Sequence, residues 1–76
     1  MAVEGGGPGV LVRPVLFAGA VLTILVNDSA RSAELALTQK SSGFRFRASV
    51  APGSAAAVLT RRGEPGEIAR WSAPGL

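Results

Sequence analysis

The chain has 76 residues, of which 47% are hydrophobic and 17% are charged, and its formal net charge is +3. This length allows one small domain, and the apolar content excludes a chain that is disordered throughout. The sequence contains no Cys and no His, which excludes disulfides, Cys/His zinc sites and reactions that use either side chain as base or nucleophile.

Both ends of the chain are rich in glycine or proline. Residues 1–9 (MAVEGGGPG) have no apolar period and predict a flexible leader. Residues 63–76 (GEPGEIARWSAPGL) predict a Gly/Pro-rich tail. The sequence therefore places one folded domain at residues 10–62, between two ends without regular structure.

The first half of this domain predicts two strands. Residues 10–17 are mostly apolar but contain Pro14, which cannot donate a hydrogen bond inside a sheet, so they predict an edge strand. After a weak turn at 18–20, residues 21–26 (VLTILV) form an apolar run that predicts a strand covered on both faces. Asn27-Asp28-Ser29 is the turn signal that ends this run.

The second half predicts three more strands. Residues 34–38 place two leucines on one face, and residues 44–50 (FRFRASV) alternate between apolar and polar side chains. Residues 39–43 predict the loop between these two strands. An Ala-Pro-Gly-Ser turn leads to a last strand over residues 55–61.

Helices over residues 29–40 and 54–62 are the alternatives, because each segment has a capping residue at its start and a glycine beyond its end. The alternation at Leu35 and Leu37 and the β-branched Val58 and Thr60 favour strands. Four or five short strands joined by turns predict an all-β fold, either a sandwich or an open barrel. We expect a small antiparallel β-sandwich with flexible Gly/Pro-rich ends, and the sequence leaves open whether the sandwich is complete.

The order of these segments is similar to that of a known domain family. An apolar strand ending in Asn-x-Ser (VLTILVNDS, 21–29) precedes an alternating strand (33–38), an aromatic strand (43–50) and a Pro-Gly-Ser turn with a final apolar strand (52–59). This pattern resembles the C-terminal β-sandwich domains of glycoside hydrolase family 30, the glucosylceramidase and endo-xylanase group. The resemblance implies a non-catalytic accessory module that stabilises a catalytic barrel or assists carbohydrate contact.

The chain departs from that family in several places. Its first hairpin turn is Ala18-Gly19-Ala20, and Thr60-Arg61-Arg62 replaces the family's aromatic ending. The catalytic (β/α)8 barrel and its two catalytic glutamates have no counterpart in the sequence. The resemblance therefore implies a detached or fragmentary accessory domain, and no catalytic residue carries over.

The carboxylates do not predict a catalytic pair. Glycoside hydrolysis needs two of them across a cleft. The sequence offers Glu4 in the leader, Asp28 in a turn, Glu34 in a strand, and Glu64 and Glu67 in the tail. None of these segments predicts a fixed separation between two carboxylates, so we interpret all five as surface charge.

Other motifs have structural interpretations as well. In residues 44–47 (FRFR) the aromatic and basic side chains alternate between faces, whereas a nucleic-acid platform needs both on one face. The basic residues Arg61, Arg62 and Arg70 are too sparse for a phosphate site. Asn27-Asp28-Ser29 fits an N-glycosylation acceptor but also a turn, and Trp71 fits a packing anchor better than a sugar platform.

The alternative interpretation is a short exported or membrane-associated protein. Residues 15–26 (VLFAGAVLTILV) are uncharged, too short to span a membrane, and of the length of a signal or anchor segment, with Arg13 before them and Ala30-Arg31-Ser32 as an exit. The Gly-rich leader with Glu4 is a poor start for such a signal, so the localisation stays open between cytoplasmic and secreted.

We therefore expect a non-enzymatic domain without catalytic, cofactor-binding or metal-binding residues and without a cofactor. The expected partner is a protein or a catalytic domain, with carbohydrate and self-association as further options and no nucleic acid. Self-association is expected because five short strands cannot cover all of the apolar surface.

Overall fold

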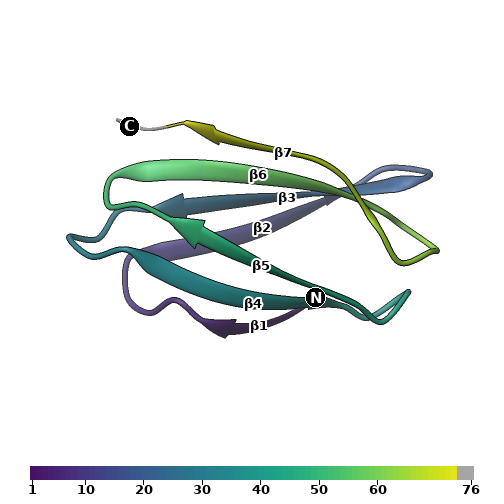
Figure 1. The fold of residues 1–76 in the computed structure, drawn as a ribbon, viewed down its shortest axis with the longest axis horizontal. Helices are drawn as coiled ribbons and strands as arrows, with labels where there is room; N and C mark the ends of the chain where they lie inside the picture. Colours follow the sequence, from purple (N-terminus) through teal and green to yellow (C-terminus); the bar gives the residue numbers. More distant parts are fainter. Residues whose placement is uncertain (74–76) are drawn as a thin grey trace.

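Seven strands follow one another along residues 1–73, the part of the chain that the computed structural model describes, and no helix is present there (Figure 1). The strands are β1 (Ala2–Gly5), β2 (Val10–Leu16), β3 (Ala20–Asn27), β4 (Ala33–Gln39), β5 (Phe44–Val50), β6 (Ser54–Arg61) and β7 (Glu67–Ala73). Their order is β1-β4-β5 in a three-stranded sheet and β2-β3-β6-β7 in a four-stranded sheet, and all neighbours are antiparallel. The prediction of a small antiparallel β-sandwich is confirmed.

Hairpins and crossings alternate along the chain. The turns at 17–19, 40–43 and 62–66 join strands that pair with each other, whereas the loops at 6–9, 28–32 and 51–53 carry the chain from one sheet to the other. In the view of Figure 1, β5 crosses in front of β2. The Ala-Pro-Gly-Ser turn closes as predicted, with Gly53 at a φ of +66° and a hydrogen bond of 3.2 Å from the Ser54 N–H to the Ala51 carbonyl.

The five strands predicted from the sequence are all present, and the two helical alternatives are wrong. Pro14 lies in β2, which is an edge strand as predicted. An edge strand tolerates proline because the missing N–H does not interrupt hydrogen bonding between two central strands. The segments 29–40 and 54–62 become strands because pairing with neighbouring strands outweighs weak capping signals.

The core lies between the sheets and takes its side chains from alternate positions. Leu37 pairs with Phe46, and both are buried. Phe44 lies on the same face, half-buried, with its ring stacked on that of Phe46 at a centroid distance of 5.9 Å. The predicted inward side of β4 and β5 is confirmed. The core cluster consists of Leu25, Ala33, Leu35, Leu37, Phe46, Ala48, Val50 and Val58.

The apolar run in β3 is covered on one face only, which corrects the prediction that both faces are buried. Val21 and Leu25 point into the core, whereas Leu22, Ile24 and Val26 are half-buried on the outer face. The reason is the number of layers: the described residues form two sheets, so the outer face of the four-stranded sheet has no third layer above it.

The leader is not free of structure, because β1 pairs with the edge of β4 from Ala2↔Thr38 to Gly5↔Leu35. Glycine is needed where the chain leaves this pairing. Gly5 has a φ of +89°, and a Cβ atom there would collide with the carbonyl oxygen of Glu34. The sequence did not predict this strand, and the glycines that follow it build the crossing to the other sheet.

The tail also contains a strand, since β7 pairs with β6 along most of its length. A bulge between Leu59 and Thr60 leaves Ile68 without a partner and shifts the alternation of β7. The bulge interrupts the alternation at Ile68, so only the short run 69–73 keeps the period of a strand. The last part of the predicted tail, residues 74–76, lies outside the described residues.

The candidate signal or anchor segment, residues 15–26, forms the end of β2, the hairpin turn and most of β3. Within residues 1–73 the structure contains no helix of the length and apolarity that crossing a membrane requires. The segment therefore contributes the edge and one central strand of the larger sheet.

Candidate functional site

The outer surface of the four-stranded sheet is apolar across all four strands. Residues paired in register lie on the same face of a sheet, so this surface can be read row by row from the pairing. We call it the apolar face. It consists of Leu11, Val15, Leu22, Ile24, Val26, Ala55, Ala57, Leu59, Ala69, Trp71 and Ala73.

Large and small side chains occupy different halves of the apolar face. The strands β2 and β3 carry leucine, isoleucine and valine, and Leu11 is 57% exposed. The strands β6 and β7 carry four alanines together with Leu59 and Trp71, of which Trp71 is 54% exposed. The alanines leave a hollow of about 280 Å³ whose lining includes Ile24, Ala57 and Trp71.

Only two charged residues belong to the apolar face by register. Arg13 pairs with Ile24 at the β2 edge, and Arg61 pairs with Ala20 at one end of the sheet. No carboxylate occupies a paired position on this face. The middle of the face therefore offers neither a charge nor a catalytic group to a ligand.

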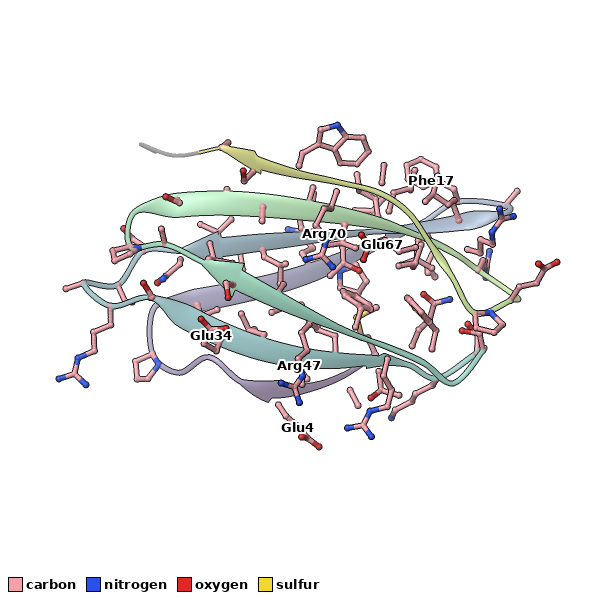
Figure 2. All side chains as sticks on the ribbon, in the orientation of Figure 1. Glu4, Phe17, Glu34, Arg47, Glu67 and Arg70 are labelled. Atoms are coloured by element: carbon pink, nitrogen blue, oxygen red, sulfur yellow. The ribbon has the colours of Figure 1, made fainter. Side chains whose placement is uncertain are left out.

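The three-stranded sheet presents the opposite kind of surface. Its outer positions carry Glu4 on β1, Glu34 on β4, and Arg45 and Arg47 on β5, and the predicted outward side of β5 is confirmed. Figure 2 shows Arg47 between Glu34 and Glu4 on this face. Alternation of apolar and polar residues is typical of a sheet with one solvated face. One side of the sandwich is thus charged and the other is apolar.

Two of the five carboxylates come onto one face, which the sequence did not predict. Pairing of β1 with β4 places Glu4 beside Ala36, and Glu34 lies two residues away on the same strand. Both glutamates are exposed, and a carboxylate oxygen of Glu34 accepts a hydrogen bond of 2.5 Å from the Ser49 hydroxyl. Both carboxylates lie on an exposed sheet surface, which leaves them solvated.

The other three carboxylates lie apart from these. Asp28 lies in the loop after β3 and Glu64 in the loop before β7, and both are exposed. Glu67 pairs with Arg70, with an N–O distance of 2.6 Å. No group of three or more potential metal ligands occurs among residues 1–73.

The pair of Glu67 and Arg70 exists because of the bulge in β7. In a regular strand, residues three apart point to opposite faces. The extra residue Ile68 brings the two side chains to the same side, where Figure 2 shows them close together. Arg70 also donates a hydrogen bond of 3.0 Å to the carbonyl of Arg47, so the pair links the open edge of β5 to β7.

The ion pair changes the pKa of both partners. The hydrogen bond from Arg70, aided by its positive charge and opposed by slight burial, lowers the pKa of Glu67 below its ordinary value of 4.5. The hydrogen bond to Glu67 raises the pKa of Arg70. A carboxyl whose pKa is lower in the folded state stabilises the fold above its unfolded pKa and loses this contribution as the pH falls.

We expect Glu67→Gln to lower the free energy of unfolding at pH 7 by less than about 1 kcal/mol, because the pair is largely exposed. The difference between wild type and variant should shrink as the pH falls below 4.5 and through the lowered pKa of Glu67. Urea unfolding at a series of pH values measures it. A difference that stays constant down to the lowest pH would show that the charge of Glu67 has no part in it.

Asn27, the last residue of β3, ties the two sheets together at one end of the sandwich. Its Nδ2 donates to the carbonyl oxygens of Arg31 at 2.7 Å and Val50 at 2.9 Å. Its Oδ1 accepts hydrogen bonds from the backbone N–H and the hydroxyl of Ser29. The amide is fully buried and both of its hydrogens are used, so the folded protein favours the turn interpretation of this motif over a glycosylation acceptor.

Gln39 ties the two sheets together at the other end of the sandwich. It is the last residue of β4, and its Nε2 donates to the carbonyl of Arg61 and, at 3.1 Å, to that of Arg62. Its Oε1 accepts a hydrogen bond of 2.5 Å from the buried Thr60 hydroxyl. Sequence reasoning placed Gln39 in a loop and missed this role, because its partners lie in a distant strand.

The three arginines considered for a phosphate site, Arg61, Arg62 and Arg70, do not form a cluster. Arg61 lies at the end of the apolar face, Arg62 donates to the carbonyl of Phe17 at 3.0 Å, and Arg70 is paired with Glu67.

Comparison of the chain with protein-family models, with curated proteins and with solved structures finds no match. The apolar face therefore stands as the candidate functional site on its own geometry. Sequence reasoning located its central strand but expected that strand to be covered. The signal for the complete face lay in residues 21–26, 55–59 and 69–73. These segments contain more apolar residues than are needed for the side of each strand that faces the core.

Proposed function

We propose that this chain is a non-catalytic β-sandwich module that works by docking on a protein surface through the apolar face. The contrast between the two sides of the sandwich carries the proposal. The same chain places charged side chains on the outer positions of β4 and β5 and aliphatic ones on the outer positions of β3 and β6. Contiguous apolar patches of this kind are typical of interaction surfaces.

The energetics of burial point in the same direction. Each Å² of apolar surface removed from water is worth about 25 cal/mol. The exposed halves of Leu11 and Trp71 and the half-buried side chains of β3 leave this stabilisation unused in the single domain. A partner surface that covers them supplies it.

Protein is a better-supported partner than carbohydrate. Ligand sites for polar small molecules need a few placed hydrogen-bonding groups. The apolar face holds a single aromatic residue, Trp71 on the outer strand β7, and its only charged residues, Arg13 and Arg61, lie at its margins. Carbohydrate contact is therefore the weaker part of the resemblance-based expectation.

The resemblance to the C-terminal domains of glycoside hydrolase family 30 supplies a candidate partner, a catalytic (β/α)8 barrel that the module stabilises. The exposed position of Glu4 and Glu34 supports the non-catalytic part of this proposal, because neither carboxylate is desolvated.

We expect Ile24→Lys to reduce binding of the dye anilinonaphthalene sulfonate (ANS) at least severalfold, because it puts a charge in the middle of the apolar face. The stability should change little, since the lysine stem can lie along the sheet with its ammonium in water. Thr38→Lys, on the outer face of the other sheet, is the matched control and should leave dye binding unchanged. A wild-type chain that binds no dye at low micromolar concentration would remove the basis for docking.

The glycoside hydrolase part is tested separately. If the reading frame next to the one for this chain encodes a (β/α)8 barrel, the purified barrel should melt at a higher temperature when this chain is added. The Ile24→Lys chain should produce no such rise. Without an adjacent barrel, or without the rise, the assignment to glycoside hydrolases is dropped and the docking proposal stands on its own.

A further inference from the structure

Resting on the proposed function, we infer that in the isolated chain the apolar face is covered by a second copy of itself, in a face-to-face dimer. The twofold axis runs parallel to the strands, between β3 and β6. This axis places β2 of one copy over β7 of the other, and β3 over β6. Two sheets packed in this way lie about 10 Å apart.

The distribution of side-chain size carries this inference. A closed twofold interface must be complementary to itself. The proposed axis keeps each register row but exchanges its two halves, so most of the bulky side chains of one copy meet alanines of the other, and Leu22 meets Leu59. Ile24 then lies over Ala57 and over the hollow beside it, and Val26 lies over Ala55. At the outer strands Leu11 lies over Ala73 and Val15 over Ala69.

The same axis also places the two charged residues of the face away from each other in the dimer. Arg13 and Trp71 belong to one register row, on opposite outer strands. The exchange therefore brings the guanidinium of one copy onto the indole of the other, a favourable cation–π contact. Arg61 comes to lie near Ala20 of the second copy, at the end of the sheet. No two arginines face each other.

The size of the face sets the expected strength. Four strands about 4.8 Å apart, each contributing about seven residues, make a surface of about 15 by 23 Å. Such an interface falls among those that bury less than about 1,200 Å² in total, which are typical of weak and reversible association. We therefore expect a dimer with a dissociation constant in the micromolar range.

The edges of the sheets are poorer places for a second copy. Pro14 interrupts the edge of β2, β1 is short, and Arg70 occupies the Arg47 carbonyl on the edge of β5. The edge of β7 carries the bulge at Ile68. Two copies could still pair edge to edge through β7. The experiment must therefore distinguish this dimer from the face-to-face dimer.

The test uses the full chain and a size exchange. Sedimentation velocity at concentrations from about 1 to about 300 µM, which bracket a micromolar dissociation constant, measures association. The emission of Trp71, the single tryptophan, reports whether the face is covered. We expect a monomer–dimer equilibrium, with the emission shifting to shorter wavelength as the dimer forms. Ile24→Ala removes the protruding side chain and Ala57→Ile fills the hollow, so each alone should weaken the dimer about tenfold or more.

The double variant Ile24→Ala/Ala57→Ile exchanges the two sizes and should restore association, because the small side chain now on β3 then faces the large one on β6 of the other copy. Arg45→Ala, on the charged face of the sandwich, is the control that should leave the dimer unchanged.

Each other outcome overturns the inference. If Ala57→Ile strengthens association, the contact is unspecific hydrophobic adhesion. If neither single variant matters, the copies meet elsewhere, as at the β7 edge. If the chain is a monomer at all concentrations but still binds ANS through Ile24, the dimer is wrong and the docking proposal stands. If the chain is a monomer at all concentrations and binds no ANS, both the dimer and the docking proposal are wrong.

Discussion

Phe46→Ala is expected to remove a large part of the stability of the protein. Phe46 is 6% exposed and lies in the core cluster opposite Leu37, with its ring stacked on Phe44. Removing a buried phenylalanine side chain costs about 3–5 kcal/mol. At roughly 0.05–0.15 kcal/mol per residue, a domain of this size has a total stability of only about 4–11 kcal/mol.

Arg45→Ala is the matched control, because Arg45 precedes Phe46 in β5 and points to water on the opposite face. Thermal unfolding followed by circular dichroism measures both variants. We expect a cooperative transition near that of the wild type for Arg45→Ala, and a lost or strongly lowered transition for Phe46→Ala. Equal and small effects of the two changes would contradict the facing of β5.

Asn27→Ala is expected to have the second largest effect. The change removes the donor to the carbonyls of Arg31 and Val50 and the acceptor for Ser29; Asn27 itself is fully buried, as is its bond to Val50. Each buried polar group left without a partner costs about 1–3 kcal/mol. The link between the end of β3 and the end of β5 should loosen as a result.

Hydrogen exchange and urea unfolding measure this effect. We expect the amides around residues 29–33 to lose protection and the unfolding midpoint to fall. Asp28→Ala is the control, since Asp28 is the exposed neighbour of Asn27. If Asn27→Ala unfolds at the wild-type urea concentration, the amide is not a structural tie between the sheets.

The local alternation of apolar and polar residues was sufficient to predict the strands that have one face in the core and one face in solvent. In β5 every second residue is apolar, and the structure places Phe46, Ala48 and Val50 in the core and the arginines in water. The Pro-Gly turn before β6 and the edge position of β2 also followed from single residues, Gly53 and Pro14, because their backbone chemistry allows few alternatives.

Local pattern failed where the deciding partner is distant in the sequence. The strand β1 exists because Ala2–Gly5 pairs with the edge of β4, far along the chain. The strand β7 was hidden because the bulge at Ile68 breaks its alternation. Gln39 reads as the start of a loop until β6 supplies its carbonyl partners.

The sequence by itself determined the all-β class, the inward and outward sides of the alternating strands, and the exclusion of chemistry that needs Cys or His. Alternation and composition are local properties, so they need no knowledge of the partner strand. Only the tertiary structure decided which apolar surface stays open. That outcome depends on how many layers the chain builds, and with two sheets the outer residues of β3 and β6 have no third layer above them.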